Sequence, residues 1–219
     1  MEKIWLLKRL IKNYMVEQNI KAVIFDVDGV LINSKDAFGK YLWDKNIEKD
    51  LGLSLDQKRY LFSSDWSLVL KGLIDTRQYF KNRFTALNIG LPVDTFIEYW
   101  LEHDLSINTE ILPVIESIKV AKLYTGTNQD SYRMALLQKK FAKYFDGMFA
   151  SHHMGFVKPE PEYFKYIEAN LNMQAQDIAF IDDSLSHVQA ATQLGWTCHH
   201  YQNIEACKNF IRILLPPTD

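Results

Sequence analysis

The feature of this sequence that most constrains its fold is a series of short apolar runs that alternate with stretches of helical pattern. The runs lack the apolar–polar alternation of a half-exposed strand, as expected where helices cover both faces of a sheet. We therefore expect buried β-strands at 21–27, 120–125, 148–151, 177–181 and 196–201. Helices are expected between the later strands, at 129–141, 161–171 and 185–194. This order predicts an α/β fold with a doubly wound parallel sheet.

One long segment interrupts the alternation. From residue 34 to residue 105 no strand is expected, and the pattern predicts helices at 36–51, 76–87 and 92–105. The chain therefore divides into a helical subdomain at 34–105 and an α/β core domain that comprises 21–33 and 106–219. An insertion directly after the first strand is expected to lie over the carboxyl ends of the strands, where open α/β sheets bind ligands.

The first 20 residues precede the first strand and form a separate N-terminal extension. Apolar residues recur there at helical spacing, which predicts one amphipathic helix that packs on the core or on a partner subunit. Its polar face is modestly basic, so docking to a membrane surface is the alternative. Basic residues interrupt the apolar stretch, which excludes an ordinary signal peptide or membrane-spanning helix.

Composition narrows the class of protein and its partners. The chain has 219 residues, and its few glycines and prolines exclude collagen-like and low-complexity proteins. A net charge of -2 gives no general attraction to nucleic acid or anionic membranes, so any anionic ligand must be held locally. Cys198 and Cys207 lie outside any metal or redox motif, and we expect both to be reduced in a cytoplasmic protein.

Two acidic pairs follow strands of the predicted sheet. The first strand runs into Asp26 and Asp28, and Gly29 then lets the backbone turn. The fourth strand ends in Asp182 and Asp183. If these strands are neighbours, three or four carboxylates meet in one crevice and repel one another unless a cation joins them. Oxygen ligands of this kind favour Mg²⁺, and a structural salt-bridge network is the alternative.

Two further polar elements follow the remaining strands. The second strand ends at Thr125 and Gly126, which offer a hydroxyl and free backbone N–H groups to a phosphate or other oxyanion. Lys158 follows the third strand. Taken alone it would be an exposed loop lysine, but beside four aspartates it becomes a fixed cation that can bridge a carboxylate and a phosphate.

The ordered segments DVDGV, LYTGTN, GFVKPEPEYF and FIDDSLSHVQAA resemble the four motifs of the haloacid dehalogenase superfamily. The match is most similar to phosphatase-like hydrolases with a small helical cap inserted between motifs one and two. The resemblance spans roughly residues 21 to 201 and implies a Rossmann-like sheet with a cap. It also implies a magnesium-dependent hydrolase acting on a small phosphorylated metabolite.

The resemblance also implies a role for each motif residue. Asp26 matches the nucleophile that forms an aspartyl-phosphate, and Asp28 the general acid and base whose main-chain carbonyl also binds the metal. Thr125 and Gly126 match the phosphate-binding segment, although many relatives carry Asn at the glycine. Lys158 matches the lysine that holds nucleophile and phosphate. The metal ligands implied are Asp26, Asp28, Asp182 and Asp183.

Two other functions remain open at this point. A sugar-phosphate mutase uses the same intermediate but returns the phosphoryl group to a sugar, and a non-catalytic module would bind a phosphorylated ligand without turnover. The second aspartate of motif one favours phosphoryl chemistry over carbon–halogen cleavage. In the insertion, Trp66, Lys71, Arg77 and His103 are candidates for reaching the substrate. Its aromatic residues and the N-terminal helix could also form a homodimer contact.

Overall fold

A parallel five-stranded sheet forms the centre of the protein. The computed structural model describes residues 20–36, 39–63 and 65–215; the predicted N-terminal helix lies outside these residues. The strands are β1 (Ala22–Phe25), β2 (Lys122–Thr127), β3 (Gly147–Ala150), β4 (Ile178–Asp182) and β5 (Thr197–His200), and their order in the sheet is β3-β2-β1-β4-β5. All four pairings are parallel, which confirms the predicted α/β sheet.

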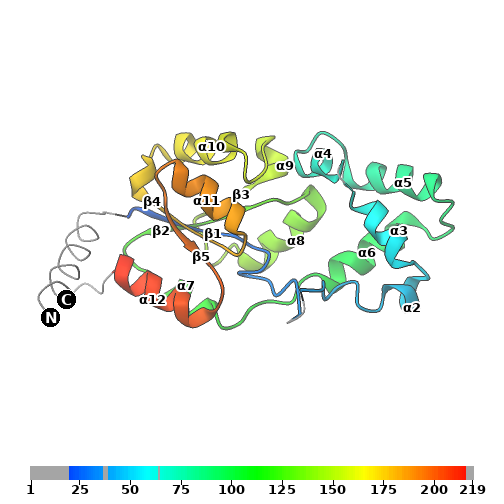
Figure 1. Ribbon diagram of the computed structural model, residues 1–219, viewed down its shortest axis with the longest axis horizontal. Coiled ribbons are helices and arrows are strands. Elements are labelled where there is room, and N and C mark those ends of the chain that lie inside the picture. Colours follow the sequence, from blue (N-terminus) through cyan, green and yellow to red (C-terminus); the bar gives the residue numbers. More distant parts are fainter. Residues whose placement is uncertain (1–19, 37–38, 64, 216–219) are drawn as a thin grey trace, which may run out of the picture.

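Helices cover both faces of the sheet, as the continuous apolar strands require (Figure 1). Val23 and Phe25 of β1 point to one face, and Ile24 points to the other. The first face packs on α7 (Leu112–Ser117), α8 (Ser131–Phe141) and α12 (Ile204–Leu214). The second packs on α10 (Pro161–Leu171) and α11 (Leu185–Gln193), with the short α9 (Ser151–Met154) and the 3-10 turn η1 (Ala175–Asp177) beside them.

Five helices follow β1 and gather beyond one end of the sheet (Figure 1). We call the segment from residue 34 to residue 105 the helical insertion. Its helices are α2 (Ile47–Leu51), α3 (Leu55–Leu61), α4 (Trp66–Leu70), α5 (Thr76–Ala86) and α6 (Val93–His103). A separate apolar cluster holds it together, in which Phe80 packs edge-on against Phe96 at 4.9 Å and stacks on Trp66 at 5.2 Å between ring centroids. The aromatic side chains thus give the insertion a core of its own.

The two segments that join the insertion to the sheet lie beside each other. Ile32 pairs with Ile107 in an antiparallel bridge. The Asn33 amide donates to the Ser106 carbonyl at 2.7 Å, and the Asn108 amide donates to the Leu31 carbonyl at 2.9 Å. The insertion therefore leaves and re-enters the core at adjacent points.

One predicted helix was wrong over most of its length. A helix was expected at 36–51, but the described part of that segment is helical only in α2. Lys35 and Tyr41 form an antiparallel bridge around a turn in which Gly39 has a φ of 76°. A residue with a positive φ cannot continue a right-handed helix. The chain reversal at Gly39 therefore stands where the first part of the predicted helix was expected.

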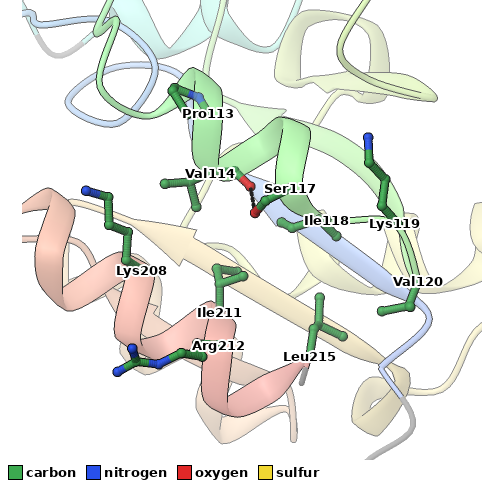
Figure 2. Close-up of a pocket in the computed structure, with 10 residues that line it drawn as sticks. All are labelled: Pro113, Val114, Ser117, Ile118, Lys119, Val120, Lys208, Ile211, Arg212 and Leu215. Carbon is green, nitrogen blue, oxygen red and sulfur yellow. Dashed lines mark hydrogen bonds between the residues drawn. The ribbon is translucent and has the colours of Figure 1, made fainter. Parts of the chain in front are cut away.

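A groove of about 500 Å³ runs between α7 and α12 (Figure 2). Its walls carry Val114, Ile118 and Ile211, and the polar residues at its edge include Lys208 and Arg212. None of the predicted site residues lines it. No helix among the described residues has the length and apolar character that a membrane crossing requires.

Candidate functional site

The predicted site residues meet at the carboxyl ends of β1, β2 and β4. β1 lies between β2 and β4, so the segments that follow these three strands leave the same edge of the sheet. A cavity of about 530 Å³ opens there. Asp26, Asp28, Lys158 and Asp183 line it, together with residues of the helical insertion.

Lys158 joins two of the predicted aspartates. Its Nζ lies 2.8 Å from Asp26 Oδ1 and 2.6 Å from Asp182 Oδ2, and it also donates to the Gly126 carbonyl at 2.8 Å. Its main chain is fixed by Asn128, whose side chain both accepts from the Lys158 amide and donates to its carbonyl. The lysine is therefore held under the strand ends rather than exposed in a loop.

Burial and charge oppose each other at this centre. Burial raises the pKa of Asp26 well above its ordinary value, and the repulsion of Asp182 adds to this, although Lys158 acts in the opposite direction. Burial also opposes ionisation of Asp182, but its pKa is lowered because the ion pair with Lys158 and the hydrogen bond from His187 outweigh that cost. Lys158 has a raised pKa despite its burial, since it faces both carboxylates. It stays charged.

Asp182 and Asp183 have different surroundings. Asp182 is fully buried and accepts from Lys158 and from the Ser184 amide. Asp183 lines the cavity, and its carboxylate occupies the space that a side chain at Gly29 would need. Burial and the neighbouring Asp182 raise the pKa of Asp183. Of this pair, Asp183 is the one that faces the cavity.

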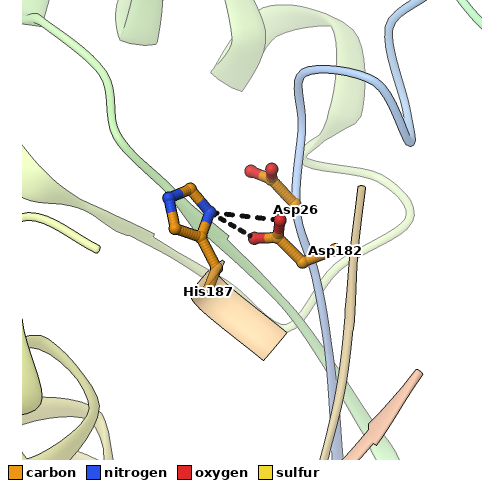
Figure 3. A group of neighbouring side chains, drawn as sticks. All are labelled: Asp26, Asp182 and His187. Carbon is orange, nitrogen blue, oxygen red and sulfur yellow. Dashed lines mark hydrogen bonds and ion pairs between the residues drawn. The ribbon is translucent and has the colours of Figure 1, made fainter. Parts of the chain in front are cut away.

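His187 is a site residue that the sequence analysis did not identify. It lies on the first turn of α11, and its Nδ1 is 3.1 Å from both oxygens of Asp182 (Figure 3). Among the described residues, Asp26, Asp182 and His187 each offer one ligand atom within 4.8 Å of the others. The signal in the sequence was its position four residues after Asp183, one helical turn into α11.

The predicted phosphate-binding hydroxyl, that of Thr125, lies within β2; like the hydroxyl of Thr127, it is buried without a hydrogen-bond partner among the described residues. β2 continues to Thr127, whereas the predicted strand ended at 125. Thr125 is consequently enclosed within the sheet and does not line the cavity, and Gly126 contributes its carbonyl to Lys158. Thr127 lines the cavity, and its buried hydroxyl has no hydrogen-bond partner among the described residues. A buried hydroxyl of this kind is stabilised by an incoming acceptor.

Asp28 is held by an arginine that the sequence analysis also missed. Arg133 donates to both carboxylate oxygens, at 2.7 and 2.6 Å, and Gln129 donates to one of them. The arginine side chain is only 2% exposed. It sits on the same stripe of α8 as the buried Leu137 and Phe141, and an arginine on an apolar stripe was the available signal.

Arg133 also reaches the helical insertion. Its Nη2 donates to the carbonyl of Asp104, just after α6, and its Nε lies 3.1 Å from the Asp104 carboxylate. Three carboxylates, Asp28, Asp104 and Asp130, thus surround one guanidinium. Burial raises the pKa of Asp104 to about 7, and the attraction of Arg133 only partly opposes this.

Of the four insertion residues proposed to reach the substrate, only Trp66 lines the cavity. Lys71 forms an ion pair with Glu160 at 2.6 Å and so ties the insertion to the core. Arg77 pairs with Asp94, also at 2.6 Å, on the exposed side of the insertion. His103 stacks on a tyrosine. These three residues do not line the cavity, which agrees with the expectation that each is first a surface or packing residue.

Known proteins show both sequence and structural similarity to this chain. The sesquiterpene phosphatase astK of Aspergillus oryzae is 27% identical over 188 residues, covering 82% of this chain and 89% of that protein. A phosphorylated carbohydrates phosphatase of Thermotoga maritima is 25% identical over 187 residues, covering 80% of this chain and 82% of that protein. Both are phosphatases, and they differ in the polarity of the substrates for which they are named.

Solved structures share the fold. A HAD family enzyme from Bacteroides thetaiotaomicron, crystallised with magnesium and inorganic phosphate, superposes with a TM-score of 0.71 at 21% identity, over 84% of this chain and 94% of that one. A HAD-like family hydrolase from Porphyromonas gingivalis gives a TM-score of 0.73 at 21% identity, over 89% and 98% of the chains. A model of the haloacid dehalogenase-like hydrolases matches residues 20–195. Sequence and fold agree that this chain belongs to the haloacid dehalogenase-like hydrolases.

Proposed function

We propose that this hydrolase is a magnesium-dependent phosphatase that cleaves phosphomonoesters of a small metabolite through an aspartyl-phosphate on Asp26. One observation carries the proposal: the Asp26 carboxylate lies 2.8 Å from the Lys158 ammonium in a cavity that Thr127 also lines, and the buried Thr127 hydroxyl has no hydrogen-bond partner among the described residues. A nucleophile, a fixed cation and a free hydroxyl donor are what an incoming phosphoryl group requires. The helical insertion serves as the cap.

The charge balance of the site supports a divalent cation. Asp26, Asp28, Asp182 and Asp183 place four carboxylates at the strand ends, and Lys158, Arg133 and Lys35 supply three positive charges against them, one of which, Arg133, is shared with Asp104. Carboxylate oxygens are the ligands that Mg²⁺ prefers. Asp26 and Asp183 are the residues that would hold the ion, because both line the cavity, whereas Asp182 is fully buried beneath it. A bound Mg²⁺ would offset the repulsion between the anionic ester and the carboxylates.

Residues of the chain then carry out two half-reactions in sequence. In the first, an Asp26 oxygen forms a bond to phosphorus while the ester oxygen departs and takes a proton from Asp28. In the second, water attacks the aspartyl-phosphate and gives its proton to Asp28, and phosphate leaves with Asp26 restored. Lys158 and the Thr127 hydroxyl stabilise the phosphoryl oxygens in both steps.

The contacts of Asp28 suit the second half-reaction. With both carboxylate oxygens accepting from Arg133, Asp28 is a proton acceptor in this arrangement. To act as the acid in the first half-reaction, it must hold a proton and give up at least one of these hydrogen bonds. Arg133 therefore acts as a positioning residue for the proton-transfer group.

The test is phosphate release from a panel of aryl, alkyl and sugar phosphates with Mg²⁺. We expect turnover by the wild type, loss of at least about 10³-fold in Asp26→Asn, and no activity after chelation. Asp56→Asn, at a side chain that is 88% exposed in the insertion, is the matched control. A phosphoryl adduct trapped by acid quench should map to Asp26.

Each alternative has its own outcome in this experiment. Isomerisation of a hexose phosphate without phosphate release would instead identify a mutase. If wild type and Asp26→Asn were equally inactive across the whole panel while still binding phosphate esters, the chain would be a binding module.

A further inference from the structure

The helical insertion contributes an aromatic wall to the cavity that contains Asp26 and Lys158. What we call the aromatic wall consists of five aromatic residues and one leucine: Tyr41, Trp43, Phe62, Trp66, Trp100 and Leu70. Its members come from separate parts of the insertion, since Trp66 and Leu70 lie on α4 and Trp100 lies on α6. The cavity is thus lined both by charged side chains and by rings with an aliphatic side chain.

We propose that the substrate of this site is a phosphate ester with an apolar body, an aliphatic chain that lies along the aromatic wall while the phosphate meets Asp26 and Lys158. The inference rests on the proposed phosphatase function and adds the substrate class. Apolar groups gain free energy when they leave water for such a wall, roughly in proportion to the area buried.

Several side chains of the wall are only partly buried in the apolar core of the insertion. Trp43 and Trp100 are each 5% exposed and are packed mainly within it. Tyr41 is 45% exposed, and Phe62, Trp66 and Leu70 are partly exposed while they line the cavity. Partly exposed apolar side chains at a cavity are the usual contact surface for an apolar ligand.

The charged side chains of the insertion that reach the cavity already have partners. Lys58 forms an ion pair with Asp44, and its Nζ lies 5.4 Å from the centroid of the Tyr41 ring. Asp104 pairs with Arg133 and accepts from the Trp100 indole at 3.2 Å. A sugar placed here would have to bury hydroxyl groups against rings, and each unpaired buried hydroxyl costs free energy.

Ser34 and Lys35 are the other polar residues through which the insertion's first segment reaches the cavity. The charge of Lys35 opposes the rise in the pKa of Asp183. Its Nζ also lies 5.4 Å from the centroid of the Tyr41 ring, as that of Lys58 does, so two lysines border the Tyr41 side of the wall. A cavity of about 530 Å³ is large enough to hold a chain of this kind, because ligand pockets are typically ~300–1,000 Å³.

The experiment compares a homologous series of monoalkyl phosphates, from butyl to octyl, with glycerol and glucose phosphates, all below micelle-forming concentrations. With Mg²⁺ present, we expect kcat/KM to rise about fourfold for each added methylene, the factor that corresponds to ~0.8 kcal/mol of burial. Octyl phosphate should exceed the sugar phosphates. A flat series, or preference for the sugar phosphates, would overturn the inference while leaving the phosphatase proposal intact.

Two leucines on α4 give a matched pair of variants. Leu70 lines the cavity, whereas Leu68, two residues earlier on the same helix, is 37% exposed and does not. Leu70→Ser should lower kcat/KM for octyl phosphate about tenfold and that for butyl phosphate less, and Leu68→Ser should change neither. Tyr41→Ser, at an exposed rim position, repeats the test with little risk to folding. Equal effects of Leu70→Ser on both esters would count against the aromatic wall.

Binding separates this inference from the proposed function. Calorimetric titration of Asp26→Asn with butyl and octyl phosphates measures chain-length dependence without turnover. If the wild type cleaves no ester at all, the proposed function fails, and tighter binding of octyl phosphate still supports the wall. If binding is independent of chain length, the inference fails whatever the activity.

Discussion

The floor of the site and the helical insertion above it are stabilised in different ways. The floor consists of charged groups at the ends of buried strands, where Lys158 holds Asp26 and Asp182 within 2.8 Å. The insertion is held by rings that pack edge-on or stacked, such as Phe80 against Phe96 and Trp66. Charged networks depend on every partner, because one missing charge leaves another buried and unpaired.

In the function that we propose, this difference would separate chemistry from recognition. The floor fixes a few atoms at short distances, as phosphoryl transfer requires. The insertion would meet the ligand through the shape and polarity of a surface rather than through individual atoms. Arg133 is the exception, because it belongs to both regions: it holds Asp28 in the floor and Asp104 at the end of α6.

The strongest challenge to this comparison is Lys158→Met. We expect phosphatase activity to fall about 10³-fold, since the phosphoryl oxygens lose their fixed cation. In chelator, the free energy of unfolding should fall by ~3–5 kcal/mol, because Asp26 and Asp182 remain buried without their partner. Urea denaturation and phosphate release measure the two effects.

Lys21→Met is the matched control for that variant. Lys21 pairs with Asp177 at 3.1 Å, but its side chain is 51% exposed. Loss of an exposed pair costs ~1 kcal/mol or less, and activity should not change. Equal losses of stability in the two variants would show that the floor does not depend on charge in the way described.

Arg133→Gln tests the boundary between the two regions. Asp28 loses both hydrogen bonds from the guanidinium, so kcat should fall about 10²-fold, an effect comparable with loss of one positioned hydrogen-bond donor. The free energy of unfolding should fall by ~3 kcal/mol at neutral pH, because three carboxylates lose their shared cation. A merely structural arginine would leave the pH profile of kcat unchanged, whereas a positioning residue for Asp28 should shift it.

Arg77→Gln is the control for this second variant. Arg77 pairs with Asp94 on the insertion surface, and both side chains are more than half exposed. We expect wild-type kinetics and an unfolding free energy indistinguishable from that of the wild type, because an exposed pair is screened by solvent.

A further comparison concerns pH. Burial raises the pKa of Asp104 from 3.8 to about 7, so the folded protein binds this proton more tightly than the unfolded chain does. Its contribution to stability is therefore present below about pH 4 and is lost as the pH rises to about 7. Asp104→Asn removes this loss.

The stability of Asp104→Asn relative to wild type should consequently increase between pH 4 and pH 7, by at most ~1.4 kcal/mol per pH unit, and stay constant above. Thermal or urea unfolding across this range gives the slope. If the stability of the variant relative to wild type did not vary with pH, the raised pKa of Asp104 would be contradicted.

The charged groups of the floor could be predicted from sequence where the ends of the strands could be predicted. Asp26 and the pair Asp182 and Asp183 come at the ends of apolar runs, and the convergence of the two strand ends required only that β1 and β4 be neighbours, which the structure confirms. The sequence analysis did not consider Thr127 because the strand boundary was placed two residues early, and boundaries depend on hydrogen bonds to neighbouring strands. Arg133 was missed because a helical arginine is usually exposed.

The insertion was less predictable for a physical reason. Its helices α5 and α6 were expected nearly as they are found, because their apolar residues recur at helical spacing. The aromatic wall depends on how short helices pack against one another, and local sequence does not determine that packing. The turn at Gly39 likewise depends on its bridge between Lys35 and Tyr41 rather than on local helix preference.

The pairing of Ile32 with Ile107 has a consequence for how such a chain can change. Because the insertion leaves and re-enters the core between two paired residues, its helices could be replaced as one block without a change in the order of the strands. A different set of helices inserted between these two positions would meet the same charged groups at the strand ends. New substrate preferences can thus arise in this architecture by replacement of one contiguous block, while the reacting atoms keep their places.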